Sequence, residues 1–277
     1  TVWDERYRLR GVCYAHLRIL YSEDLFGSDA PAVTARIRGK KLYDSRSAAT
    51  AFSDNAALAV RDYLLSEDYG FSSGAASVDE TAASVAANDC DQLVTRADGA
   101  TEKRYTANGV LDTSATIGEN LRTLVDAMAG KISYMGGVFA INAGAYALTS
   151  LTVADAQLVN AIDFRNRNLR EAFNGARAVY RNPALDWREE EYPPYQNAAA
   201  LSADGDPRWL DLPMPLTTSG ARTQRIAKIA VMRSRAARTV SLSAMLSRME
   251  IRAGDVIALI TAKSNIDAVV YEVRALT

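Results

Sequence analysis

The stretch from residue 103 to residue 146 constrains the fold of this chain most, because its signals for a strand, a helix and a hairpin agree with one another. A short β-prone run over residues 104–108 comes first. Four side chains with oxygen atoms that suit a helix start follow it: Asp112, Thr113, Ser114 and Thr116. Apolar residues then recur at the three- and four-residue spacing of a helix with one buried face. They are Ile117, Leu121, Leu124, Val125 and Met128.

Glycine residues indicate where this helix ends and where a hairpin follows it. Gly130 stands where a left-handed residue ends a helix. Ile132 then begins an alternation of apolar and polar residues, and Gly136-Gly137 supplies the positive φ angles of a tight turn before residues 138–145 return. The stretch therefore predicts an α+β unit in which one helix lies across a small antiparallel sheet, and none of its residues suggests catalysis.

Composition limits the classes of protein to be considered. The chain has 277 residues, of which 48% are hydrophobic and 23% charged, which suits a folded soluble protein with room for two domains. Its net charge of −1 argues against a protein that coats nucleic acid, so any contact with DNA must be local. Cys13 and Cys90 permit one disulfide at most and have no metal-ligand spacing, and we expect both to be buried thiols.

The single histidine, His16, lies in an alternating run and is expected on a strand, so a histidine-based triad or a multi-histidine metal site is not expected. No apolar stretch has the length of a membrane span, and the N-terminus lacks the pattern of a signal peptide. Because the chain starts at Thr1 and ends in a strand-like run, we expect a segment of a longer polypeptide.

The remaining residues alternate between helical and strand patterns. Strands are predicted over residues 6–21 and 32–38, as the end of a β domain. Helices are predicted over residues 56–66, capped by Ser53 or Asp54, and over about 78–95, with Val85, Cys90, Leu93 and Val94 on the packing side. After residue 146 we expect a helix at 219–238, a long irregular stretch at 183–207, and strands at 148–153, 162–165, 174–181, 239–246, 254–261 and 268–276.

Four strings in this order carry a resemblance to a known family: RGKKLYDSRSAATAFSDNAALAVRDYLLSEDYGF, EKRYTANGVLDTSATIGENLRTLVDAMAGKISYMGG, DLPMPLTTSGARTQRIAKIA and IRAGDVIAL. From about Val33 onwards the chain resembles the J-type tail-tip proteins of long-tailed bacteriophages, also called central tail hub or tip attachment proteins. It departs from the family at Ser45, often proline, and at Phe52, often tryptophan. Neither change is expected to alter the fold.

The resemblance implies a structural role in the virion, at the tip of the phage tail. Such proteins form a trimeric hub that caps the tail tube, and they combine barrel-like tube domains with peripheral α+β domains and packed helices. It implies an upstream tube-like domain ending in residues 1–37, a peripheral domain at 38–150, and a second tube-like domain at 151–277. Implied partners are the tail-tube and distal tail proteins, a tape-measure protein in the lumen, passing DNA, and a host receptor contacted by regions outside this segment.

An aromatic group surrounds an acidic run in the second half of the chain: Trp187, Tyr192, Tyr195 and Trp209 flank Glu189, Glu190 and Glu191. One reading is a site that stacks on or hydrolyses a glycan, because carboxylates beside aromatic rings suit that chemistry. The other reading, which we favour, is a loop ordered by its aromatics against a neighbouring subunit.

The predicted helix at 219–238 is basic, with Arg222, Arg225, Lys228, Arg233, Arg235 and Arg238. This surface could repeat around a channel and meet DNA phosphates. The alternative, which we favour, is a solvated face or one that pairs with acidic groups of the next protein.

Two weaker motifs, Asp204-Gly205-Asp206 and the basic turn at residues 40–46, are interpreted as plain turns because the other ligands of a calcium or phosphate loop are missing. We therefore expect a hub protein that acts by assembly, with no cofactor and no catalytic residue. The alternatives are a cell-wall hydrolase that uses the glutamates and a glycan-binding module that uses Trp187.

Overall fold

The structure is a computed structural model that describes residues 14–20, 22, 24, 33–145, 151–166, 172–236, 238–248, 250–252, 254–274 and 276. It divides into two units, residues 1–38 and residues 39–277. In the first unit, the described residues 14–20 and 33–38 form no strand and are exposed, His16 among them. The strand predictions are therefore wrong for these residues in the isolated chain; the rest of the predicted strand at 6–21, with Cys13, lies outside the described residues.

The second unit begins with a short hairpin, β1 Lys41–Asp44 and β2 Ala49–Phe52, and a helix, α2 Ala56–Leu65. Asn55 caps α2, not the predicted Ser53 or Asp54, because its side-chain oxygen accepts the N–H groups of Ala57 and Leu58 at 3.0 and 3.2 Å. The amide of Asn55 also donates to the carbonyl of Ala87 at 2.9 Å. One buried side chain thus caps α2 and ties it to the next helix.

The second helix, α3 Glu80–Asp91, is shorter than predicted. The chain leaves it at Gln92 for a small hairpin, β3 Leu93–Thr95 and β4 Thr101–Lys103, turned by Gly99 at φ 83°. Val85 and Leu93 are 56% and 67% exposed, so their predicted place on the packing side is wrong. Buried alanines and Cys90 face α2 instead, and small side chains let two helices approach closely.

Asp79 caps α3 and gives a first testable prediction. Its carboxylate accepts the N–H groups of Thr81 and Ala82, each at 3.0 Å, and pairs with Arg252. The bond from Ala82, followed by the Arg252 contact, holds the pKa of Asp79 below its usual value. We expect Asp79→Ala to lower the free energy of unfolding by about 1 kcal/mol at neutral pH.

The loss should depend on pH in a defined direction. Because folding depresses the pKa of Asp79, its stabilising contribution is complete above the unfolded value and is lost as the pH falls through the folded value. Urea unfolding of wild type and Asp79→Ala should therefore give midpoints that converge in acid. A gap that stays constant from neutral pH down to about pH 2 would contradict the assignment.

The stretch around residue 117 folds much as predicted. The helix α4 Ile117–Asp126 starts with a reciprocal capping box between Thr116 and Glu119. The hairpin β5 Lys131–Met135 and β6 Val138–Asn142 turns at Gly136 and Gly137, whose φ angles are 61° and 85°. The strand predicted at 104–108 is absent from these described residues, and the strand lies earlier, at β4.

The end of α4 differs from the prediction by one residue. The left-handed residue is Ala129, at φ 47°, and not Gly130. Gly130 is needed for a different reason, since a Cβ atom there would lie 2.5 Å from the carbonyl oxygen of Asn142 in the hairpin. The glycine therefore permits close approach of two backbone segments, which local helix-stop rules do not reveal.

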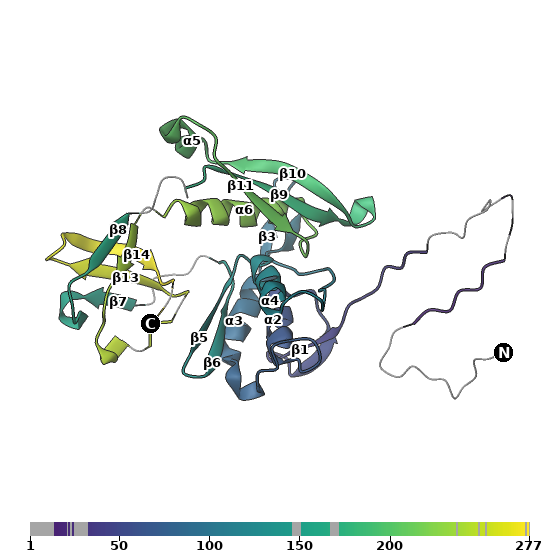
Figure 1. The fold of residues 1–277 in the computed structure, drawn as a ribbon, viewed down its shortest axis with the longest axis horizontal. Coiled ribbons are helices and arrows are strands. Elements are labelled where there is room, and N and C mark those ends of the chain that lie inside the picture. Colours follow the sequence, from purple (N-terminus) through teal and green to yellow (C-terminus); the bar gives the residue numbers. More distant parts are fainter. Residues whose placement is uncertain are drawn as a thin grey trace. The chain divides into compact units, whose positions relative to one another are not determined.

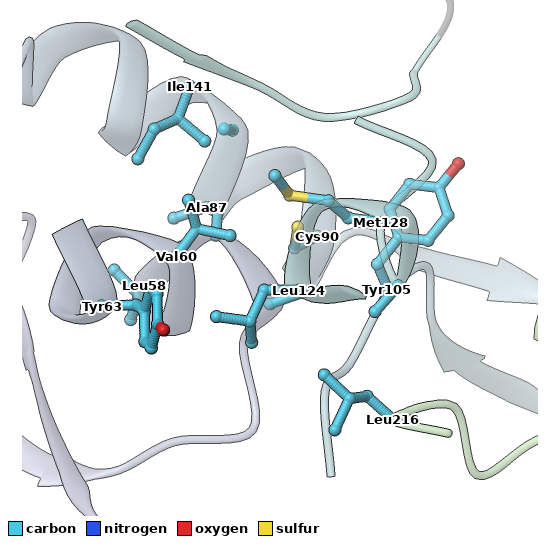
Figure 2. Close-up of a cluster of buried hydrophobic side chains, with 14 of the residues drawn as sticks. Leu58, Val60, Tyr63, Ala87, Cys90, Tyr105, Leu124, Met128, Ile141 and Leu216 are labelled. Carbon is cyan, nitrogen blue, oxygen red and sulfur yellow. The ribbon is translucent and has the colours of Figure 1, made fainter. Parts of the chain in front are cut away.

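Helices α2, α3 and α4 and strand β6 enclose the main core (Figure 2). Its fully buried large side chains include Tyr63, Tyr105, Met128 and Ile141. Leu216 and Ile226, from the second half of the chain, are buried in the same cluster. The α+β body is therefore completed by residues that lie far away in sequence.

The second half contains a sheet of β9 Gly175–Asn182, β10 Arg188–Gln196 and β11 Trp209–Met214 in the order β10-β9-β11, with β10 antiparallel and β11 parallel to β9. Helix α6 Gly220–Ser234 packs on this sheet (Figure 1). The prediction of an irregular stretch at 183–207 is wrong, because it contains β10 and helix α5 Ala198–Asp204. Two prolines hid the strand, and an edge strand tolerates them.

The last elements form their own small core. Strands β7 Leu151–Ala154, β13 Val256–Thr261 and β14 Ile266–Glu272 make a sheet in the order β14-β13-β7, and β8 Asp163–Asn166 pairs with β12 Arg238–Ser241. Val153, Leu259 and Ile266 are buried between them. This confirms the predicted α+β fold class with small sheets; in the described residues no sheet closes into a barrel. The domain boundaries at 37/38 and 150/151 stay a prediction.

Among the described residues, no helix is both long enough and apolar enough to cross a membrane.

Candidate assembly surfaces

Most arginines of the basic helix α6 form ion pairs or hydrogen bonds with other residues of the same chain. Arg225 pairs with Glu102 of β4 at 3.1 Å and donates to the carbonyl of Arg104 at 2.9 Å. Arg222 is only 5% exposed, lies 3.7 Å from Glu102, and donates to the carbonyl of Lys103 at 3.1 Å. Burial lowers the pKa of Arg222 from its ordinary value. These two arginines therefore join α6 to the small hairpin of the α+β body.

The arginines at the other end of α6 are also engaged. Arg233 donates to the carbonyl of Ala129 at 2.6 Å and lies 3.4 Å from Glu272 of β14. Arg235 pairs with Asp204 at 2.6 Å. Lys228 is exposed. The predicted helix at 219–238 is too long, because α6 ends at Ser234; Arg238 is exposed in strand β12, with its guanidinium 5.6 Å from the ring centre of Phe164. The exposed positive charge of α6 is therefore much smaller than its composition indicates.

The four aromatic candidates do not converge on one place. Tyr192 packs edge-on against Tyr180 with ring centres 6.1 Å apart and lies against Gly220, so it faces α6. Tyr195 also packs on the α6 side, in the cluster around Ala227 and Val231.

The two tryptophans lie near opposite ends of strand β9. Trp209 packs on Gly175, with the Arg177 guanidinium 4.8 Å from its ring centre, while Trp187 belongs to the turn after Asn182. At ~3.3 Å per residue, the strand separates them by about 20 Å. The two rings therefore cannot stack on one sugar.

The glutamate run lies on the edge strand β10. Successive strand residues point to opposite faces, so Glu190 is directed away from Glu189 and Glu191. Glu190 accepts hydrogen bonds from Tyr180 at 2.6 Å and from Asn182, and these bonds hold its pKa below the usual range. Burial and the Glu190 carboxylate raise the pKa of Tyr180 to about 12. Glu189 pairs with Arg181 at 2.9 Å.

A general acid in a glycosidase needs a raised pKa, which is the opposite of what Glu190 has. The hydrolase reading stays a hypothesis, and it has a direct check. Clearing of purified peptidoglycan by the chain, lost in Glu189→Gln, Glu190→Gln or Glu191→Gln, would support it. Equal clearing by these variants would show that the glutamates are not responsible.

No described group of three or more His, Cys, Asp or Glu side chains could hold a metal ion. In the Asp204-Gly205-Asp206 turn, the Asp204 carboxylate is occupied by Arg235 and by the amide of Asn174 at 2.9 Å. The amide of Asn174 also stabilises the turn, because it donates a second hydrogen bond to the carbonyl of Asp206 at 2.8 Å.

Two structural features are not predicted by the sequence patterns. One is the buried joint around Glu102, which also accepts the hydroxyl of Ser219 at 2.6 Å. The other is the strand β14, which lies at the edge of its sheet with Val269 and Val270 44% and 56% exposed. Neither is visible as a local motif, because the first joins residues more than a hundred positions apart and the second depends on strand order.

Comparison with known proteins adds the family context. No family model matches the chain. The baseplate hub protein pb3 of Escherichia phage T5 is 25% identical over 279 aligned residues, which cover 92% of this chain. The chain spans only 29% of that protein's length.

A solved structure supports the fold. A protein in the virion of a native gene transfer agent particle matches with a TM-score of 0.50 and 19% identity, over 62% of this chain and 39% of that one. At this identity the likeness concerns the fold alone. The predicted resemblance to phage hub proteins is confirmed, because the chain is similar to a phage baseplate hub protein, and the expected location in the phage tail agrees with this similarity.

Proposed function

We propose that this chain is the hub-forming part of a tail-tip protein. It would assemble as a trimer that caps the tail tube, contacts tube, distal tail and tape-measure proteins, and leaves a channel for DNA. Receptor contact would fall to regions outside residues 1–277. The observation that carries this proposal is the match to a baseplate hub protein along 92% of the chain.

The internal contacts of α6 support a role in assembly. A protein that transmits contacts between tail components needs rigid joints, and α6 connects the small hairpin at Glu102, the end of α4 at Ala129, and β14 at Glu272. Such a joint uses arginine because its planar group makes several directed hydrogen bonds at once.

The same contacts bear on DNA passage. We propose that DNA is not held by α6, because its arginines at 222, 225, 233 and 235 are committed to carbonyl and carboxylate groups of the chain. Weak contact suits a channel, since tight phosphate binding would oppose movement of the DNA.

The test is the native mass of the purified chain across a range of concentrations, alone and with tail-tube protein. A trimer in either condition is the expected result. A chain that remains monomeric in both would contradict the proposed function.

A further inference from the structure

The edge strands β10 and β14 differ in the residues that would prevent another strand from pairing with them. The edge strand β10 carries three consecutive glutamates and the pair Pro193-Pro194. Charges and prolines on an edge prevent another strand from pairing with it. The edge strand β14, Ile266–Glu272, has no lysine and no proline, and its two acidic residues, Asp267 and Glu272, lie on either side of the uncharged run 268–271. The outer edge of this run is therefore chemically open to an additional strand.

The exposure of apolar side chains on β14 also indicates that this strand can accept an additional strand. Val269 and Val270 are consecutive and therefore point to opposite faces, yet they are 44% and 56% exposed. A bulge near Ala268, at φ 50°, interrupts the register on one side. Residues 269–272 pair regularly with β13, so four residues of straight edge are available.

A segment with complementary properties is present in the same sequence. Residues 33–38 alternate strictly, with Val33, Ala35 and Ile37 on one side and polar residues on the other, which is typical of a half-buried strand. In the isolated chain they form no strand, and Val33 and Ile37 are 56% and 72% exposed. The segment has the pattern of a strand without forming one.

We propose that the β14 edge is an intersubunit surface, on which residues 33–38 of a second copy of this chain bind as an added strand. This inference rests on the proposed trimeric function. Pairing of β14 with β14 would create a two-fold contact and stop at a dimer, whereas an arm-to-edge contact is head-to-tail, the kind of contact from which a closed ring such as the proposed trimer is built. The backbone hydrogen bonds of the edge supply affinity, and the apolar side of the arm covers the exposed valine on the face where it lies.

The test uses single charge substitutions in the full chain. Val270→Glu on the edge and Ile37→Glu on the arm should each raise the dissociation constant of the trimer at least about tenfold, because assembly would bury an unpaired carboxylate. Val85→Glu on α3 is the matched control, since Val85 is also 56% exposed, and Thr34→Glu is the control on the polar side of the arm. Sedimentation equilibrium gives the dissociation constants.

A second measurement does not depend on any variant. Amide hydrogen exchange at residues 269–272 of the wild-type chain should slow as the trimer forms, while exchange in β10 stays unchanged. A trimer that forms equally well with Val270→Glu and Ile37→Glu, with unchanged exchange in β14, would overturn the edge proposal and leave the hub proposal standing. A wild-type chain that is monomeric alone and with tail-tube protein would overturn both.

Discussion

Replacing Glu102 by alanine should lower the free energy of unfolding by about 3–5 kcal/mol, the usual loss when one partner of a buried ion pair is removed. The Glu102 side chain is 10% exposed and receives Arg225 at 3.1 Å and the Ser219 hydroxyl at 2.6 Å. Without it, Arg222 and Arg225 remain next to each other with no carboxylate between them. The Arg222 guanidinium is already incompletely hydrogen-bonded, because its Nε atom is buried and has no hydrogen-bond partner. Loss of the Glu102 carboxylate would therefore leave this buried charge with fewer compensating contacts.

Chemical denaturation followed by circular dichroism measures this loss. Glu191→Ala is the control, because it removes an exposed glutamate from β10 and should change stability by less than about 0.5 kcal/mol. A double-mutant cycle with Arg225→Met separates the pair from the loss of packing. If Glu102→Ala and Glu191→Ala were equally stable, the joint between α6 and β4 would not contribute to the stability of this fold.

The parts of the fold that sequence predicts well are those set by neighbours in the chain. The capping box of α4 and the glycine turn of the β5–β6 hairpin depend on residues within a few positions. Strand β9 was also predicted nearly in full, because apolar residues alternate along it. In each case the local pattern and the tertiary environment favour the same structure.

The errors have physical causes of another kind. Strand β10 contains Pro193-Pro194 and three glutamates, so its sequence favours a loop, and only pairing with β9 makes it a strand. The arginines of α6 suggest a basic surface because a helix pattern does not reveal which charges have partners. Their partners, such as Glu102 and Ala129, lie about a hundred positions earlier. Long-range pairing therefore decides both the strand and the candidate site.

The turn after α2 gives the second large expected effect. Residues 71–73 fold back on the end of this helix: the N–H groups of Phe71 and Ser73 donate to the carbonyls of Tyr63 and Leu64, both at 2.9 Å. These bonds satisfy helix carbonyls that would otherwise lack partners. Gly70 makes the approach possible, since a Cβ atom there would lie 1.9 Å from the Tyr63 carbonyl oxygen.

Gly70→Ala should therefore lower the free energy of unfolding by about 3 kcal/mol, at the upper end of overpacking effects, because the obstacle is backbone and cannot rotate away. Gly118→Ala is the matched control. Gly118 lies in α4 with no atom within 4 Å of its Cβ position, so the same substitution should stabilise the protein by about 0.5–1 kcal/mol. Urea denaturation of the two variants should move the midpoint in opposite directions. Equal midpoints would mean that the turn at residues 70–73 does not pack on α2 as the structure describes.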